Sequence, residues 1–432
     1  MKIFKSIVIA ATLLALLAAP ALIHAQVPAR EVSEWDRLSG ICRPYPDFEQ
    51  PFSAAPKGYE AFYLSHLGRH GSRYQTTLQI YERPLSMLER ADSLGLLTAE
   101  GREALSAVRT INDAVRGRVG DLTPVGEQEH RHIAERMYRH YPSIFKGRGV
   151  FLDVQSSERM RSTLSGVFAA ERLKELNPSI TVTRSASPGN WEWIFDLRQS
   201  QTIARKLKAE GWYTHAKKRS LCSPERLCRL LFTDAGGHIP EQDRWMVLYD
   251  IYNLAVDCKA SGLGELDLFR FLDPEEAYPL WETDNALFYW RQCRSREFGD
   301  LAMKDAVNIV KRIISEADAA IAGHTRGANL RYGHDQNVAT LASFIGLGGR
   351  SRTADSFDGI KEVFRDWETV PMACNIQMVF YRPRRGDGPV LVRFMINEEE
   401  TGLDGLQPAS GLFYDWDKIR EALEKELNNI SL

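Results

Sequence analysis

Short apolar strands alternate with helical segments in this chain of 432 residues, and this restricts the possible folds more than any other feature. Residues 60–65 and 150–155 have the pattern of buried strands, and residues 329–332 form a third, shorter one. Segments with helical periodicity follow each of them. This alternation favours an α/β sheet.

The other predicted elements divide the chain. Helices are predicted at 79–96, 99–116, 123–138, 156–176, 301–322, 337–345 and 416–427. Alternation at 375–381 and 390–396 indicates an antiparallel hairpin at a sheet edge. Residues 187–296 are rich in Trp, Leu and charged residues and have few strand patterns. We therefore predict a discontinuous α/β domain, 26–186 and 297–432, around a mostly helical insertion at 187–296.

The first residues have the order of a secretory signal peptide. Lys2 and Lys5 precede an apolar run at 7–23, and Ala25 closes a small-residue cleavage site. An uncleaved membrane anchor is the alternative, but the run is shorter than the roughly 20 residues that span a bilayer, and Pro20 interrupts it. We expect residues 1–25 to be removed and the protein to be secreted or periplasmic.

If the protein is exported, its cysteines can be either paired in disulfides or free thiols. Six are present, and an oxidising compartment permits disulfides between them. Sequence alone does not choose a pairing, and buried free thiols are the alternative. Their positions are Cys42, Cys222, Cys228, Cys258, Cys293 and Cys374. No spacing of Cys and His suggests a zinc site.

The strongest cluster of polar residues follows the first strand. Arg69 and Arg73 flank His70, and Gly71 relieves steric crowding there. Open α/β sheets bind ligands at the carboxyl ends of their strands. Guanidinium groups present paired donors to phosphate oxygens, and a His between them can attack phosphorus. A loop with two solvated arginines is the alternative.

Two further strand ends repeat this chemistry. Arg159 and Arg161 follow the second strand, and His334 and Asp335 follow the third. Taken singly, the arginines could form salt bridges on a helix face, and Asp335 could cap a helix. Together, the three strand ends would bring cations, a nucleophile and an acid to one crevice.

The run Arg-His-Gly-Ser-Arg at 69–73, with His334 and Asp335, resembles the histidine acid phosphatases, the branch of the histidine phosphatase superfamily that includes phytases. The resemblance extends to residues 122–127 and 158–163 and covers nearly the whole mature chain. It implies an α/β fold of the phosphoglycerate-mutase-like kind, with a mixed sheet flanked by helices and an inserted helical domain.

The resemblance also implies roles for individual residues. His70 matches the nucleophile that becomes phosphohistidine, and Asp335 matches the proton donor. The residues that match the phosphate-binding set are Arg69, Arg73, Arg161 and His334. Arg161 is preferred to Arg159 by alignment with the family's Arg-x-Arg pattern. No metal or other cofactor is expected, and an acidic pH optimum follows because Asp335 must begin the reaction protonated.

Two motifs narrow the range of possible phosphate-ester substrates. Arg-Tyr-Gln-Thr at 73–76 is similar to the Arg-Tyr-Pro-Thr run of multiple inositol polyphosphate phosphatases, and residues 267–272 and 286–290 also look like theirs. Those proteins typically carry His-Ala-Glu where this chain has His-Asp-Gln at 334–336, as in acid phosphatases and several bacterial phytases. We favour inositol polyphosphates, with a broad-specificity acid or sugar-phosphate phosphatase as the alternative.

Other functions are less favoured. A phosphomutase would need phosphorylated sugar metabolites that are mainly cytosolic. A phospholigand-binding protein without turnover would not need both His70 and Asp335. The net charge of −2 excludes a nucleic-acid partner recruited by bulk charge. We expect one partner class, a small-molecule phosphomonoester, and no membrane contact after cleavage; the oligomeric state stays open.

Several residues have a plain structural interpretation as well as a functional one. A basic stretch could line a pocket or form a solvated helix face: Lys206, Lys208, Lys217, Lys218 and Arg219. The tryptophans near 191–193 and 281–290 are expected in the core of the insertion. The remaining histidines are expected to be surface or core residues: His66, His130, His132, His140, His215, His238 and His324.

Overall fold

The computed structural model describes residues 32–47, 52–212 and 220–431. Residues Glu34–Leu432 form one compact unit, which carries the sheet and the helices. The predicted signal peptide at 1–25 lies outside the described residues, as do His215, Lys217, Lys218 and Arg219.

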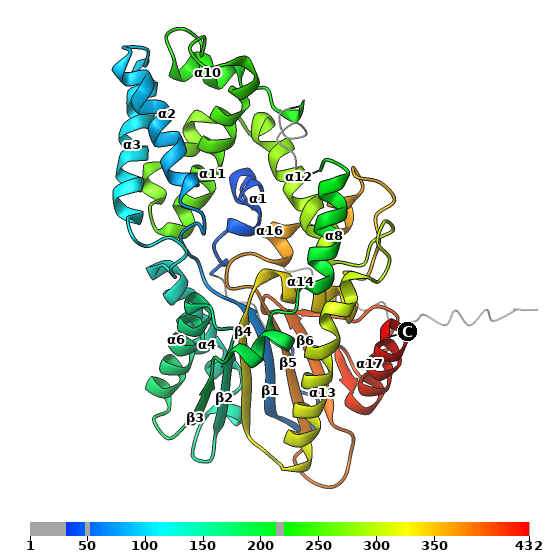
Figure 1. Ribbon diagram of the computed structural model, residues 1–432. Helices are drawn as coiled ribbons and strands as arrows, with labels where there is room; N and C mark the ends of the chain where they lie inside the picture. Colours follow the sequence, from blue (N-terminus) through cyan, green and yellow to red (C-terminus); the bar gives the residue numbers. More distant parts are fainter. Residues whose placement is uncertain (1–31, 48–51, 213–219, 432) are drawn as a thin grey trace, which may run out of the picture. The chain divides into compact units, whose positions relative to one another are not determined.

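The described residues form one sheet of eight strands, in the order β3-β2-β4-β1-β5-β6-β7, with β8 paired to β6 (Figure 1). The strands are β1 (Tyr59–Arg69), β2 (Phe151–Ser156), β3 (Thr181–Ser185), β4 (Gly327–Gly333), β5 (Asn375–Pro383), β6 (Leu391–Ile396), β7 (Glu399–Thr401) and β8 (Phe413–Asp415). β3, β2, β4 and β1 run parallel, whereas β5 is antiparallel to β1 and β6 is antiparallel to β5. The mixed sheet confirms the predicted fold class.

Four strands differ from the prediction, and two of them, the short strands β7 and β8, were not predicted at all. β1 continues to Arg69, beyond the predicted end at residue 65, because its last residues pair with both β4 and β5. β3 was not predicted, since this edge strand has mostly exposed side chains and one apolar residue, Val182. The predicted hairpin at 375–396 is present as β5 and β6.

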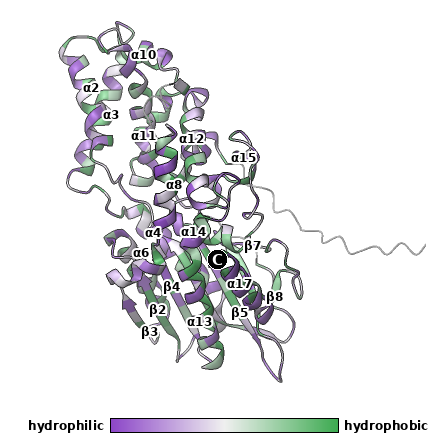
Figure 2. Cartoon of the chain, turned by 45° about the vertical axis from the view of Figure 1, so that its right-hand side comes forward, coloured by the Kyte–Doolittle hydropathy of each residue, from purple (hydrophilic) through white to green (hydrophobic). Residues whose placement is uncertain are grey.

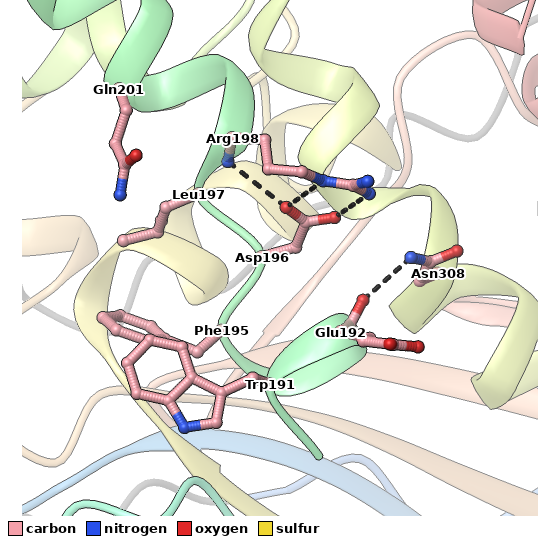
Figure 3. A pocket seen from close by; sticks show the side chains of 8 residues that line it. All are labelled: Trp191, Glu192, Phe195, Asp196, Leu197, Arg198, Gln201 and Asn308. Carbon is pink, nitrogen blue, oxygen red and sulfur yellow. Dashed lines mark hydrogen bonds and ion pairs between the residues drawn. The ribbon is translucent and has the colours of Figure 1, made fainter. Parts of the chain in front are cut away.

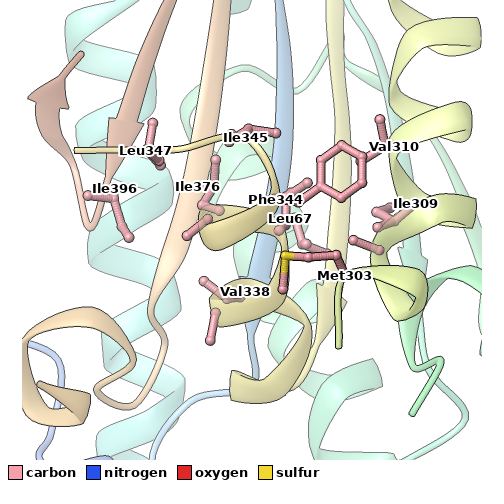
Figure 4. Close-up of a cluster of buried hydrophobic side chains, with 14 of the residues drawn as sticks. Leu67, Met303, Ile309, Val310, Val338, Phe344, Ile345, Leu347, Ile376 and Ile396 are labelled. Carbon is pink, nitrogen blue, oxygen red and sulfur yellow. The ribbon is translucent and has the colours of Figure 1, made fainter. Parts of the chain in front are cut away.

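Helices cover both faces of the sheet. On one face, α4 (Pro124–His140) and α6 (Met160–Leu176) share a buried core with Leu64 of β1. On the other face, α13 (Val307–Ala322), α14 (Asp335–Phe344) and α17 (Trp416–Ser431) share a core with Tyr63. Neighbouring strand residues join different cores because side chains alternate across a strand. Figure 4 shows part of the second core, where Val338 lies beside the strands.

A group of helices has a separate core. Its members are α2 (Gln79–Ser93), α3 (Ala99–Val115), α10 (Glu225–Leu231), α11 (Trp245–Ser261) and α12 (Pro274–Gln292). Hydrophilic and hydrophobic residues mix along α2 and α3 (Figure 2), as expected for helices with one buried face. Segments from 79–115 and from 225–292 thus pack together. The domain boundaries at 187 and 296 stay a prediction.

Short helices complete the structure. They are α1 (Glu34–Leu38), α5 (Pro142–Phe145), α7 (Trp191–Ile194), α8 (Arg198–Ala209), α15 (Ile360–Val363) and α16 (Asp366–Thr369), with 3-10 turns η1 (Gly40–Cys42), η2 (Pro188–Asn190), η3 (Glu241–Asp243), η4 (Gly264–Leu266), η5 (Leu268–Phe271) and η6 (Ala302–Ala306). The helix predicted at 301–322 is therefore η6 followed by α13. The capped start predicted near 123 is present, because the Thr123 hydroxyl accepts a hydrogen bond from the Gly126 N–H.

Within the described ranges, no helix is long and apolar enough to cross a bilayer. Buried free thiols are found at Cys42, Cys228, Cys258, Cys293 and Cys374. Burial raises the pKa of the Cys228 thiol to about 11.

Candidate active site

The three predicted strand ends meet at one edge of the sheet. In the parallel pair of β1 and β4, Arg69 lies opposite Gly333, so His70 and His334 follow at the same level. In the pair of β2 and β4, Ser156 lies opposite Tyr332, so Ser157 follows beside them. The rings of His70 and His334 lie 5.5 Å apart, centre to centre. The register of three strands therefore builds the cluster.

His70 has one ring nitrogen free for chemistry. Nδ1 lies 2.8 Å from the carbonyl oxygen of Gly71, an acceptor only, so Nδ1 carries the proton and donates it. The lone pair is then on Nε2. Burial, and after it the charges of Arg69 and Arg161, hold the pKa of His70 well below its usual range. The ring is therefore neutral and nucleophilic near neutral pH.

Arg69 is fully buried and fixed from two directions. Its Nη1 donates to the carbonyl oxygens of Ile41 at 2.6 Å and Val370 at 2.9 Å. Its Nη2 forms an ion pair with Asp335 Oδ2 at 3.0 Å. Asp335 opens α14, where its Oδ1 also accepts the Gln336 N–H at 2.9 Å. The predicted cation and the predicted acid are thus in direct contact.

Arg73 and Arg161 add positive charge to the cluster, and within the described residues neither forms an ion pair. Arg73 donates to Gln75 Oε1 at 3.3 Å. Burial, followed by the charge of Arg73, lowers the pKa of Arg161 to about 10. Neighbouring cations without an ion-pair partner attract anions, so this arrangement indicates an anion-binding site.

His334 completes the cluster. Its Nε2 lies 3.1 Å from the Ser157 hydroxyl, and the Phe195 ring lies 3.9 Å from its own ring, centre to centre. Burial, followed by the charge of Arg161, holds the pKa of His334 well below its usual range. A neutral His334 offers one N–H to an anion. By contrast Arg159 is exposed, with its guanidinium over the Trp191 ring.

The backbone of the loop at 69–73 is occupied by internal hydrogen bonds. The acceptors of the N–H groups are Cys374 O for Arg69 (2.8 Å), Gly333 O for His70 (3.0 Å), Ser165 Oγ for Gly71 (3.1 Å) and Glu129 Oε2 for Ser72 (2.7 Å). None of these four N–H groups is left for a ligand. The amides of residues 69–72 would therefore not hold an anion at this site, unlike those of a phosphate-binding loop whose backbone amides point at the ligand.

Two glycines allow this loop to touch α4. A Cβ on Gly71 would lie 2.5 Å from the Gly126 carbonyl oxygen. A Cβ on Gly126 would lie 2.3 Å from the Ser72 carbonyl oxygen. Both contacts are with backbone, which cannot move aside as a flexible side chain would. Larger residues at either position would displace His70 from its neighbours.

A pocket of about 440 Å³ lies beside the cluster (Figure 3). Its lining combines aromatic, apolar, amide and charged side chains: Trp191, Glu192, Phe195, Asp196, Leu197, Arg198, Gln201 and Asn308. Phe195 connects it to His334. Trp191, expected in a core, lines this pocket instead. Within it, Arg198 pairs with Asp196 at 2.6 Å.

The remaining predictions have mixed outcomes. Lys206 and Lys208 are exposed on α8 and are not among the pocket's lining residues. His66 and His130 are buried, and burial lowers the pKa of each to about 3.

Ser157, Ser165 and Glu129 were not predicted as site residues. No group of three or more His, Cys, Asp or Glu side chains in the described ranges could hold a metal ion.

Solved structures of similar fold exist. The apo form of the multiple inositol polyphosphate phosphatase of Bifidobacterium longum is 19% identical, with a TM-score of 0.75 over 90% of this chain and 97% of that one. Its complex with inositol hexasulfate has a TM-score of 0.72 at 18% identity, with the same coverage. The phytase of D. castellii has a TM-score of 0.64 at 13% identity, over 95% of this chain and 90% of that one. The fold implied by the histidine acid phosphatase resemblance is confirmed.

Comparisons with protein families and with curated proteins give no match to this chain.

The uncompensated cations predict that inorganic phosphate stabilises the protein. At a concentration of about 100 times Kd, phosphate should add about 2.7 kcal/mol to the free energy of unfolding. Arg161→Ala removes one charge-assisted hydrogen bond and should weaken phosphate binding by at least about tenfold. Thermal unfolding at increasing phosphate concentrations measures both effects. Arg159→Ala is the control and should keep the wild-type response; equal losses in the two variants would contradict this assignment.

Proposed function

We propose that this protein is an exported phosphomonoester hydrolase that acts through a phosphohistidine on His70, with inositol polyphosphates as its favoured substrates. One observation carries the proposal. The free Nε2 of a neutral His70 lies among Arg69, Arg73 and Arg161, and among the described residues only Arg69 has a carboxylate in an ion pair, Asp335. The 1–25 segment, with the pattern of a signal peptide, supports export.

In the first step, the phosphoryl group transfers to His70. Nε2 attacks phosphorus, the bond from phosphorus to the ester oxygen breaks, and that oxygen takes a proton from Asp335. The charge on the three phosphoryl oxygens is balanced by Arg73, Arg161 and Arg69. Substrate also competes with Asp335 for Arg69, which releases the carboxyl group to take up the proton that it then donates.

In the second step, water releases the phosphate. The Asp335 carboxylate removes a proton from water, the water oxygen attacks phosphorus, and the phosphorus–nitrogen bond breaks. The lone pair returns to Nε2, and the hydrogen bond from Nδ1 to Gly71 O preserves the same tautomer throughout. Inorganic phosphate leaves, and Asp335 gives up its proton to solvent as the carboxylate pairs with Arg69 again.

Two similarities support the substrate class. The structures of similar fold are an inositol polyphosphate phosphatase and a phytase by name. The Arg-Tyr-Gln-Thr run at 73–76 resembles the corresponding run of the first group. The His-Asp-Gln run at 334–336 departs from that group, and it favours a broad acid or sugar-phosphate phosphatase as the second candidate.

The nucleophile can be identified by trapping. Substrate carrying labelled phosphate should transfer the label to the wild-type protein within one turnover. The reaction is quenched in alkaline denaturant, because a phosphorus–nitrogen bond hydrolyses in acid. His70→Ala should show no label and no turnover above the reaction without enzyme. Full turnover by His70→Ala would exclude this mechanism.

A substrate panel separates the two candidate functions. Phytate, glucose 1-phosphate and an aryl phosphate are compared by kcat/KM, with His70→Ala as the background. Each additional charge-assisted contact is worth about 1.5–3 kcal/mol, so phytate should exceed glucose 1-phosphate by at least about tenfold. Equal values for the two, or a higher value for glucose 1-phosphate, would favour the broad phosphatase.

The role of Asp335 depends on the leaving group. Asp335→Asn should lower the rate of phosphoenzyme formation from alkyl phosphates by about 10²–10⁴, because an alkoxide is a poor leaving group. An aryl phosphate with an acidic phenol should lose much less, since a phenolate leaves without a proton. Equal losses with both substrates would argue against proton donation by Asp335.

A further inference from the structure

Glu129 lies buried on α4, directly beneath the loop that carries His70. Its Oε2 accepts the Ser72 N–H at 2.7 Å. Its Oε1 accepts the Ser72 hydroxyl at 2.7 Å and the Tyr45 N–H at 2.8 Å. Only 7% of the residue is exposed. One carboxylate therefore receives three short hydrogen bonds, two of them from the loop.

No cation compensates this carboxylate by direct contact. Within the described residues, no Lys, Arg or His forms an ion pair with Glu129. Burial raises the pKa of Glu129, whereas the Ser72 and Tyr45 N–H groups oppose that effect. A buried carboxyl group of this kind is costly, and the three donors are its compensation. The fold therefore uses this costly group to hold one particular serine.

The contacts of Glu129 lead back to the start of the same loop. Tyr45, whose N–H binds Glu129, accepts a hydrogen bond on its hydroxyl from Asn375 Nδ2 at 3.2 Å. Asn375 directly follows Cys374, whose carbonyl oxygen accepts the Arg69 N–H at 2.8 Å. This series of contacts thus connects Arg69, on one side of His70, with Ser72, on the other side. The helix is also locked to the loop by Gly126.

We propose that Glu129 is a positioning residue, which holds Ser72 and so fixes His70 and Arg73 relative to each other for phosphoryl transfer. The inference rests on the proposed function, since it assumes that His70 is the nucleophile. Reacting groups that are displaced by about 1 Å lose about 10²-fold in rate. The loop has no helix or strand of its own at Ser72. Thr123 binds the Ser72 carbonyl oxygen, and Glu129 supplies the constraint on the Ser72 N–H and hydroxyl.

Glutamine is not a conservative replacement at this position. The three groups that face Glu129 are all donors. An amide has one oxygen acceptor and one NH₂ donor, so its nitrogen would face an N–H or O–H donor from Ser72 or Tyr45. Glu129→Gln keeps the shape of the side chain and breaks the hydrogen-bond pattern. The loop should then shift away from Glu129.

The test compares kcat and KM with an aryl phosphate. Glu129→Gln should lower kcat by about 10- to 100-fold and change KM by less than about threefold, because Arg69 is held by Ile41, Val370 and Asp335, and Arg161 lies on a different element, α6. Ser72→Ala removes only the hydroxyl contact and should lower kcat by about 3- to 10-fold. The double variant should be no slower than Glu129→Gln alone, since both changes break the same contact.

Glu135→Gln is the matched control. It makes the same substitution on α4 at a partly exposed glutamate that pairs with Arg172, away from the loop. It should keep wild-type kcat. If Glu129→Gln also keeps wild-type kcat, if the two glutamate variants lose alike, or if the Ser72 and Glu129 effects add independently, the inference is wrong.

The outcomes separate this inference from the proposed function. Inactive His70→Ala with fully active Glu129→Gln would overturn only the role of Glu129. Active His70→Ala would overturn the mechanism itself. Circular dichroism and thermal unfolding establish that each variant is folded. If Glu129→Gln does not fold, Ser72→Ala decides by the same measure, because wild-type kcat in that variant overturns the inference.

Discussion

Unbalanced positive charge at the ends of three parallel strands is the constraint on which the rest of the site depends. Arg73 and Arg161 have no carboxylate partner among the described residues, and only Arg69 has one, in Asp335. Partly buried cations without partners destabilise the empty protein. An anionic ligand supplies the missing negative charge. Binding therefore removes the repulsion among the arginines, and this relief adds to the binding free energy. Burial, and after it these charges, lowers the pKa of His70 and of His334, so both rings stay neutral.

The surrounding fold must hold these charges in place against their mutual repulsion. Arg69 is tied to the carbonyl oxygens of Ile41 and Val370, which come from opposite ends of the chain. Tyr81 of α2 donates to Asp257 of α11 at 2.7 Å and accepts the Gln75 N–H at 2.7 Å. Contacts with the helical group, and with the two carbonyl oxygens that bind Arg69, thus hold the loop on two sides. This distribution explains why distant segments pack around one short motif.

The sequence predicted site residues at or soon after strand ends, including Arg161 and Asp335 in the first turns of α6 and α14, and it missed Glu129 and Ser165, which lie further along α4 and α6. His70, His334 and Asp335 could be grouped because parallel strands end at a common edge, whatever the details of packing. Glu129 and Ser165 could not, since their contacts with the loop depend on how α4 and α6 sit on the sheet. The Gly126 contact with Gly71 was the available signal, but it has meaning only once the two backbones are known to touch.

The predicted fold class is confirmed, but some elements and contacts were missed for related reasons. β3 has little apolar character because it lies at an edge, so periodicity could not find it. The pairing of α2 and α3 with α10 and α11 is a contact over more than a hundred residues of chain, which local patterns do not encode. Trp191 was expected in a core on composition, yet it lines a pocket beside Phe195. Element types follow from local sequence, whereas burial depends on the assembled neighbours.

The internal hydrogen bonds of the loop at 69–73 have a consequence for how such a site can evolve. A loop that binds phosphate through its amides is indifferent to most of its side chains, and its affinity changes only if the backbone is rebuilt. Here the N–H groups of residues 69–72 bind acceptors within the protein, and contact with the ligand depends mainly on side chains. Natural selection can therefore retune affinity and preference by single replacements around an unchanged frame. Proteins that share this backbone arrangement can therefore differ in substrate preference while they keep the same strands, strand register and glycines.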